Sequence, residues 1–278
     1  MSRAIVVIPV YRERLTAEER EAVRRIRDIL GGHERAAIVP DTMRETPFDA
    51  ERVPFDKAYF EGTASYSTLL LSDTFYARFE RYEYILLHQL DALVFRDELN
   101  EWCGKGYDYI GAPVHVDKYN PRSRAVVGNG GFSLRKVESF RRVLSSTRMK
   151  DRSSSRFLID ILKEDVPDVP LRSLTSLYHR ARILRSVRRG VEAYTRAYSL
   201  NEDLFWSLRA RLFFPSFKTP PPIEAAEFAI ENFPRLWYDT IGKKTPFGCH
   251  AWAKWDRGFW EELDSSLKNL RNNGEHGG

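Results

Sequence analysis

Hydrophobic and polar positions in the first 40 residues predict the start of a parallel β-sheet. Residues 4–10 form a continuous, β-branched apolar run, which is typical of a strand buried on both faces. Residues 16–32 then carry apolar side chains at three- and four-residue steps, and Thr16 with Glu19 forms a capping-box signal for a helix. Residues 36–40 are apolar again, which predicts a second strand over 35–40. The order strand, helix, strand is typical of doubly wound α/β domains.

The rest of the pattern continues this alternation. Residues 41–62 lack periodicity and contain two prolines, which predicts a long loop. We expect further strands at 84–88, 107–113 and within 126–135, and further helices at 65–79, 136–144, 201–213 and 223–233. Together they predict one domain over residues 1–260, a mixed, mostly parallel, Rossmann-like sheet flanked by helices. Residues 145–200 are polar and basic and predict a helical insertion, and residues 261–278 predict a helix end and a disordered tail.

Composition narrows the class of protein. The chain has 278 residues, of which 42% are hydrophobic and 13% aromatic, enough for a substantial core. A net charge of +5 favours anionic ligands but is low for a dedicated nucleic-acid binder, so no nucleic-acid partner is expected. The two cysteines, Cys103 and Cys249, provide neither a disulfide framework nor a cysteine-based metal site. No apolar run has the length of a signal peptide or a membrane span, and we expect a cytoplasmic protein.

The run YILLHQLDALVF (84–95) raises the question of chemistry, because Asp91 follows an apolar strand directly. Ligands of open parallel sheets bind beyond the carboxyl ends of the strands. A carboxylate there can hold Mg²⁺ or Mn²⁺ whose other ligands are phosphate oxygens. The alternative is an aspartate that only caps the next turn.

Five segments in order, AIVVIPVYRE, YILLHQLDALVF, YDYIGAP, GNGGFSLR and NEDLFW, resemble nucleotide-sugar-dependent glycosyltransferases of the GT-A fold. The resemblance runs from about residue 4 to 255 and is strongest to a microbial group with Q-x-D and G-N-G-G-F-S-L-R motifs. It implies a GT-A type sheet and a divalent cation, Mn²⁺ or Mg²⁺, at a D-x-D signature. Here Gln89-Leu90-Asp91 stands in its place, which leaves Asp91 as the single strong ligand and strict metal dependence open.

The resemblance also assigns the donor site. It places Asn129, Gly130 and Gly131 near the sugar, where glycines permit close backbone approach; the alternative is an ordinary hairpin or bulge turn. The end of the first strand would face the nucleotide base. Pro9, Tyr11 and Glu13 are candidates there, with Tyr11 stacking on the base, and Asp41 would accept a hydrogen bond from a uracil N–H. The alternative for these residues is ordinary loop structure.

Two further segments carry candidate catalytic groups. Glu202 and Asp203 begin a predicted helix, where acidic residues also complement the helix dipole. The resemblance implies that one of them deprotonates the acceptor hydroxyl, and Asp203 is preferred, with Glu202 as the alternate. His250, in PFGCHAW, is by default a structural histidine. The resemblance implies that it is a second ligand of the metal or diphosphate.

Residues 172–196 contain seven arginines and one glutamate, with apolar residues at helical spacing. This predicts an amphipathic helix whose apolar side packs on the core. Its cationic side would meet anionic membrane headgroups or a lipid-diphosphate-linked acceptor.

The sequence thus predicts a glycosyltransferase that moves a sugar from a nucleotide diphosphate, a UDP-sugar, to a hydroxyl of a glycan or lipid-linked acceptor. This activity suits surface polysaccharide assembly at the inner face of the membrane. A nucleotidyltransferase is disfavoured because YRERLTAEE, after the first strand, has no glycine-rich loop. The alternative is a non-catalytic protein that binds RNA or an anionic glycan through the arginine-rich segment.

Overall fold

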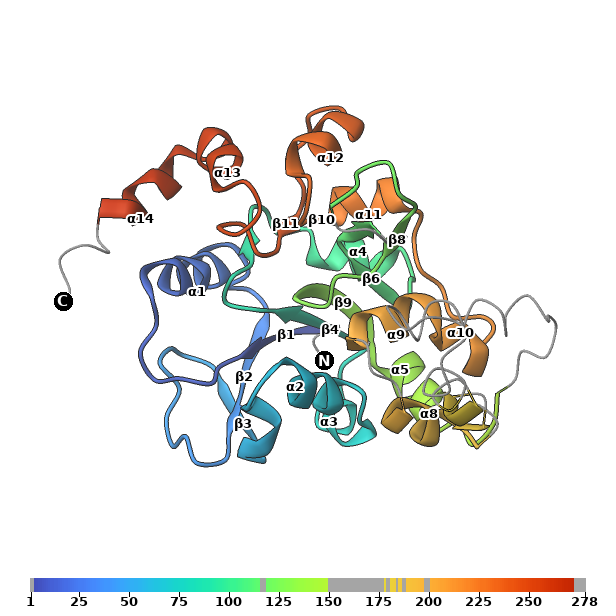
Figure 1. Cartoon of the computed structure of the whole chain (residues 1–278). Coiled ribbons are helices and arrows are strands. Elements are labelled where there is room, and N and C mark those ends of the chain that lie inside the picture. The colour runs from blue at the N-terminus through green and yellow to red at the C-terminus, as the bar shows by residue number, and fades with distance from the viewer. Residues whose placement is uncertain are drawn as a thin grey trace.

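Six strands form a central sheet in the order β3-β2-β1-β4-β9-β6 (Figure 1). The computed structural model describes residues 3–115, 119–149, 189–197 and 201–272, with residues 178, 181–183, 185 and 186. The strands are β1 Ala4–Pro9, β2 Glu34–Pro40, β3 Glu51–Phe55, β4 Tyr84–His88, β6 Tyr109–Gly111 and β9 Phe132–Lys136. The first four run parallel, and β9 is antiparallel to both β4 and β6. The predicted mixed, mostly parallel sheet is confirmed.

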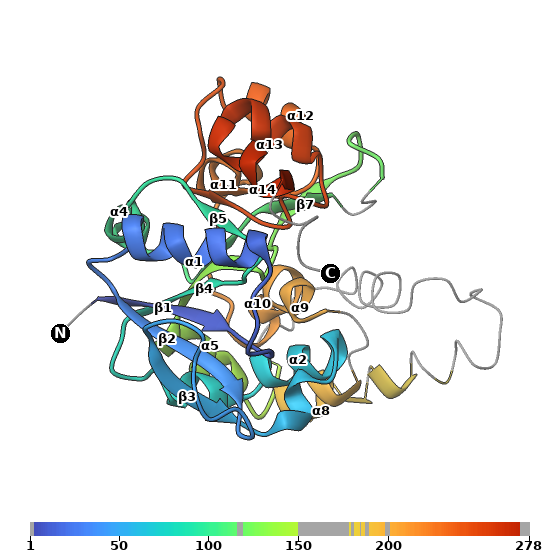
Figure 2. The ribbon, with the colours of Figure 1, turned by 90° about the vertical axis from the view of Figure 1, so that its left-hand side faces the viewer.

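Alternate residues of the strands face two helical layers, as expected for a strand buried on both sides. Val6 and Ile8 of β1 belong to a core cluster with residues of α1 and α4, whereas Ile5 and Val7 belong to one with residues of α2, α3, α5 and α9. In Figure 2, α1 lies above β1 and α2 lies below it. The helices are α1 Ala17–Ile29, α2 Thr63–Leu70, α3 Asp73–Ala77, α4 Leu99–Gly104, α5 Val137–Leu144 and α9 Glu202–Leu208.

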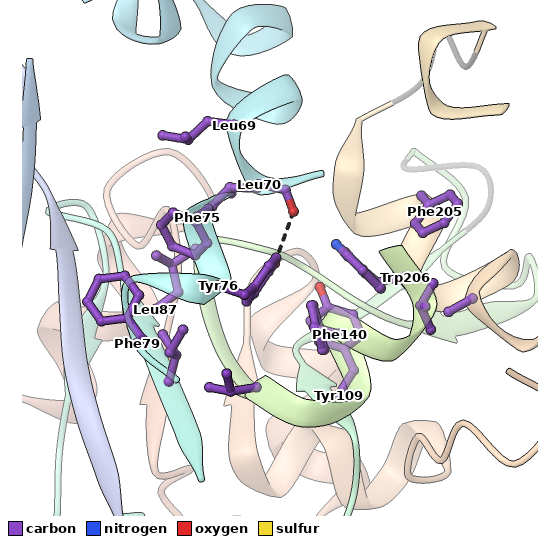
Figure 3. Packing of buried hydrophobic residues seen from close by; sticks show 14 of the residues in the cluster. Leu69, Leu70, Phe75, Tyr76, Phe79, Leu87, Tyr109, Phe140, Phe205 and Trp206 are labelled. Carbon is purple, nitrogen blue, oxygen red and sulfur yellow. Dashed lines mark hydrogen bonds between the residues drawn. The ribbon is translucent and has the colours of Figure 1, made fainter. Parts of the chain in front are cut away.

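Aromatic side chains fill the layer below the sheet (Figure 3). The rings of Phe140 and Trp206 lie with centroids 3.9 Å apart, and Tyr76 packs against both. The Tyr76 hydroxyl donates to the carbonyl of Leu70 at 3.0 Å, which satisfies a buried polar group. This layer packs α3, α5 and α9 against one another.

Local signals account for α1. The Thr16 hydroxyl accepts from the backbone N–H of Glu19 at 3.2 Å, and the Glu19 carboxylate accepts from the N–H of Thr16 at 2.7 Å. The predicted capping box is therefore confirmed.

Two predictions about the first half of the chain are wrong. Residues 41–62 are not one loop, since they contain β3 and a 3₁₀ helix at Lys57–Phe60. Because β3 is an edge strand, Pro54 costs the sheet no internal hydrogen bond. The single helix expected at 65–79 is two helices, α2 and α3.

The second half adds short strands and helices beyond the central sheet. Strands β7 and β8 pair with each other, and a three-stranded sheet has the order β10-β11-β5. The helix expected at 223–233 ends early, because β10 begins at Ala229. The bounds are β5 Leu93–Val94, β7 Pro113–His115, β8 Ala125–Val127, β10 Ala229–Ile230, β11 Gly248–Cys249, α10 Ala210–Phe213, α11 Pro222–Phe228, α12 Pro234–Thr240, α13 Arg257–Leu263, a 3₁₀ helix Ser265–Lys268 and α14 Asn269–Asn272.

The basic segment is only partly described, and most of the helix predicted at 172–196 lies outside the described residues. A continuous helix is nevertheless wrong, because Gly190 has φ 98° and α8 begins after it, at Val191–Ala197. Val191 and Tyr194 are buried in the core, so the apolar side packs as predicted. The tail predicted at the C-terminus, residues 273–278, also lies outside the described residues. No helix in the described parts of the chain is long and apolar enough to span a bilayer.

Candidate active site

The carboxyl ends of β1 and β4 open onto a cavity of about 710 Å³. Its lining brings together four of the predicted donor residues, Pro9, Tyr11, Gln89 and Asp91. Residues 60–63 and Tyr66 line it from the side of α2. This is the edge at which ligands of open parallel sheets bind.

The other predicted donor residues do not line this cavity; Asn129, Gly130 and Gly131 belong to the turn before β9, and Glu13 and Asp41 lie elsewhere. Glu13 is exposed. Asp41 follows β2, and its carboxylate accepts from the backbone N–H of Lys57 at 3.3 Å. This contact is one that ordinary loop structure provides, and the role of Asp41 toward a uracil stays a prediction.

Three side chains with metal-ligating atoms converge beside the cavity, of which Gln89 and Asp91 line it. Nε2 of His250 lies 3.0 Å from Oε1 of Gln89 and 3.1 Å from Oδ1 of Asp91. The His250 backbone is held by β10, because its N–H donates to the carbonyl of Ile230 at 3.0 Å. The side chain of Asp91 is 57% exposed and that of His250 only 11%, so the carboxylate faces the open cavity.

The charges of this cluster are coupled. Burial alone would lower the pKa of His250, but the carboxylates of Asp91 and Glu231 raise it to about 10. Burial alone would raise the pKa of Asp91. The positive charge of His250 outweighs the effect of burial, so the pKa of Asp91 is lowered. His88, the last residue of β4, is buried. Burial lowers its pKa to about 4, so the ring stays neutral.

The spacing of the cluster is compatible with a divalent cation. Without an ion, Nε2–H of the charged His250 imidazole donates to Oε1 of Gln89 and pairs with Oδ1 of Asp91. Two ligands at right angles, each about 2.1 Å from an ion, would also lie about 3 Å apart, so a cation could replace this proton. Among the described residues no three His, Cys, Asp or Glu gather around one point, so a cation here would also need phosphate oxygens or water as ligands.

The glycine turn, residues 128–131, lies between this cluster and Asp203, the predicted base. A Cβ on Gly131 would lie 2.1 Å from Nε2 of His250, and one on Gly130 would lie 2.4 Å from Oε1 of Glu202. Both positions therefore require glycine because side chains fill the space on either side. The hairpin alternative is wrong, since β8 pairs with β7 and β9 pairs with β4 and β6.

The turn is also fixed by hydrogen bonds. The Gln89 N–H donates to the carbonyl of Gly131 at 2.8 Å, and the Gly131 N–H donates to Oδ1 of Asn129 at 2.8 Å. The first bond joins the Q-x-D segment to the glycine turn. Two motifs 40 residues apart thus form one rigid unit.

Glu202 has a structural partner. It is buried, and its Oε1 accepts from Arg135 at 2.8 Å, while the Arg135 side chain is fully buried. Arg135 also donates to the Tyr76 hydroxyl at 3.0 Å and to the Gly130 carbonyl at 3.2 Å. Burial raises the pKa of Glu202, and the guanidinium opposes this rise. The geometry therefore does not favour Glu202 as the alternate base.

Asp203 is the carboxylate that remains available. Burial, and next the negative charge of Glu202, raise its pKa to about 7. Its Oδ1 accepts from the N–H of Leu204 at 2.8 Å, and its Cβ lies 3.5 Å from the Cβ position of Gly130. A carboxylate beside the glycine turn with a pKa near neutrality has the property that a general base needs.

Sequence reasoning missed two residues of this site. Tyr66 lines the cavity, and its hydroxyl is buried without a hydrogen-bond partner among the described residues. Glu231 lies behind His250 and accepts from Nδ2 of Asn129 at 2.7 Å. An acidic residue directly after a short strand is a weak signal, although it is the same signal that identified Asp91.

Residues 49–250 match a protein family described as "Protein of unknown function (DUF5672)". No protein with curated annotation is similar to the chain in sequence.

Solved structures of similar fold include three glycosyltransferases. One is involved in the glycosylation of the major capsid of PBCV-1 (9% identity, 95% of this chain and 98% of that chain, TM-score 0.42). The second is galactosyltransferase LgtC in complex with donor and acceptor sugar analogues (12% identity, 99% of this chain and 97% of that chain, TM-score 0.44). The third is mouse xyloside xylosyltransferase 1 (12% identity, 88% of this chain and 96% of that chain, TM-score 0.45).

Proposed function

The chain belongs to the DUF5672 family of proteins of unknown function, and we propose that it is a glycosyltransferase that moves a sugar from a nucleotide-diphosphate donor to an acceptor hydroxyl. One observation carries this proposal. The Gly130–Gly131 turn has the Asp91–Gln89–His250 cluster on one side and the carboxylate of Asp203 near it on the other. This arrangement supports the proposal because the cluster would hold a leaving diphosphate and Asp203 would serve as base for an attacking hydroxyl.

The donor would occupy the cavity at the ends of β1 and β4. Asp91, Gln89 and His250 would hold a divalent cation, and the mix of imidazole and oxygen ligands suits Mn²⁺ better than Mg²⁺. When bound, the cation would neutralise the charge of the diphosphate. Tyr11, 57% exposed at the cavity, offers a ring on which the base of a UDP-sugar can stack.

Asp203 would supply the base. As the acceptor oxygen forms its bond to the anomeric carbon, its proton passes to the Asp203 carboxylate. The bond from the anomeric carbon to the diphosphate oxygen breaks, and the diphosphate leaves with the electron pair. The raised pKa of Asp203 strengthens it as a base for this transfer.

Binding of the donor tests this proposal most directly. We expect calorimetry to show Mn²⁺-dependent binding of UDP, weaker binding of GDP, and at least a tenfold loss of UDP affinity in Asp91→Asn, because the single carboxylate ligand is removed. Asp49→Asn, a fully exposed aspartate far from the cavity lining, is the matched control. If the folded wild-type protein binds neither nucleotide with any cation, there is no donor site.

The acceptor is proposed to be a glycan or lipid-linked hydroxyl at the cytoplasmic face of a membrane, as in surface polysaccharide assembly. Arg182, Arg185 and Arg189 are exposed around a hollow of about 380 Å³. None of the three forms an ion pair with a described residue. Unpaired arginines on one surface suit anionic headgroups.

Flotation with vesicles that contain phosphatidylserine, at low salt, tests this surface. Replacing Arg182, Arg185 and Arg189 together with alanine should weaken binding at least tenfold, since each cation near an anionic surface contributes about 1 kcal/mol. Replacing the exposed arginines Arg20, Arg24 and Arg27 of α1 changes the net charge equally and should have a smaller effect. Equal losses in the two triple variants would mean that net charge, rather than this surface, is responsible.

A further inference from the structure

Glu231 occupies a central position behind the cation cluster. It follows β10, and its side chain is 14% exposed. Its carboxylate accepts from Nδ2 of Asn129 at 2.7 Å and from Nε1 of Trp255 at 3.3 Å. Its Oε1 also lies 3.4 Å from Nδ1 of His250. One carboxylate therefore contacts the glycine turn and the histidine ring.

We propose that Glu231 is a positioning residue, which orients the His250 imidazole so that Nε2 faces Asp91 and Gln89 and thereby sets the affinity for the cation. This inference rests on the proposed function. A histidine ligand commonly donates its second ring N–H to a carboxylate, which fixes the tautomer and the orientation of the ring. Glu231 occupies that place at Nδ1.

The surroundings leave the ring few alternatives. Nδ1 is buried and makes no hydrogen bond with any described residue, and Oε1 of Glu231, 3.4 Å away, is its ion-pair partner. On the other side, the ring packs so closely on Gly131 that a Cβ there would lie within 2.6 Å of three ring atoms. A ring rotated by 180° would turn a C–H toward Glu231 and move Nε2 away from Asp91.

Glu231 also acts on the surface against which the ring packs. Asn129 donates to Glu231 through Nδ2 and accepts from the Gly131 N–H through Oδ1 at 2.8 Å. The carboxylate therefore contacts the ring directly through the ion pair and contacts the Gly131 backbone through Asn129. The position of Nε2 depends on both contacts.

Glu231→Gln is the informative substitution because it keeps the shape and changes the hydrogen bonding. An amide N–H directed at Nδ1 would favour the tautomer with the proton on Nε2, the atom that must be free to bind a metal. We expect Mn²⁺ affinity in the presence of UDP, measured by calorimetry, to fall by about 10- to 100-fold. Glu227→Gln, the same change four residues upstream, should bind as the wild type does.

A double-mutant cycle separates positioning from a general structural effect. In the His250→Ala background, Glu231→Gln should cost little further Mn²⁺ affinity, since the ring it orients is gone. An equal loss in both backgrounds would show that Glu231 acts independently of His250 and would overturn the proposal. Wild-type affinity in the Glu231→Gln single variant would overturn it as well.

A measurement without metal keeps this inference distinct from the proposed function. Histidine-selective ¹⁵N NMR of the metal-free protein should show a proton on Nδ1 of His250 in the wild type and its loss in Glu231→Gln. An unchanged Nδ1 signal contradicts the positioning role. If the wild-type protein binds no cation or nucleotide but the signal changes, the proposed function fails while the orienting contact stands.

Discussion

Asp203→Asn is expected to lower the rate of sugar transfer by about 10²- to 10⁴-fold, the usual contribution of a general base, while the protein still folds and binds its donor. Asparagine keeps the shape of the side chain and the contact with the N–H of Leu204. It has no carboxylate to accept the proton of the acceptor hydroxyl. The measurement is the transfer rate at saturating UDP-sugar, with UDP affinity determined in parallel.

Asp203 also determines how the transfer rate should depend on pH. Because burial and Glu202 raise the pKa of Asp203 to about 7, wild-type activity should rise as the pH increases through about 7. A raised carboxyl pKa also means that the contribution of this group to stability is full below its unfolded pKa and is lost as the pH rises through about 7. At pH 8 the Asp203→Asn variant should therefore melt at the same temperature as the wild type or higher.

The control for Asp203 is an aspartate outside the site. Asp239→Asn, on the exposed side of α12, should leave both rate and pH profile unchanged. If Asp203→Asn transfers sugar at the wild-type rate, another group is the base and the assignment is wrong.

Glu202→Gln is expected to act on stability instead. The change leaves the guanidinium of Arg135, which is fully buried, without its counter-charge. Breaking a buried ion pair by removing one partner typically costs 3–5 kcal/mol, and we expect a loss of about this size in the free energy of unfolding. Urea denaturation of the two proteins at pH 7 measures it.

A double variant checks the cause. Arg135→Met combined with Glu202→Gln removes both charges, and it should recover part of the loss, because the unpaired buried charge has gone. If Glu202→Gln is instead as stable as the wild type but has lost transfer, the roles of the two neighbouring carboxylates are the reverse of those proposed here.

The sequence predicted those strands and helices whose formation depends on neighbouring residues in the chain. The buried strands at 4–9 and 84–88 are continuous apolar runs, and α1 has its cap within four residues. Asp91 was recognisable because strand ends of a parallel sheet share one edge.

Other parts depend on distant residues and could not be predicted. The Arg135–Glu202 pair joins positions 67 residues apart, and the Asn129–Glu231 bond joins positions 102 apart. Strand β3 contains a proline and is tolerated only because it lies at the edge of the sheet. Strands β10 and β11, two residues each, have too little pattern to detect, and they place Glu231 and His250.

The reversed direction of β9 decides on which edge of the sheet the glycine turn lies. Because β9 runs against β4, the chain enters β9 at the edge where β1 and β4 leave the sheet. A parallel strand would enter from the opposite edge and bring the glycine turn to the far side of the molecule. Here the turn lies as bare glycine backbone between the imidazole of His250 and the carboxylate of Glu202, which therefore never come into contact across it.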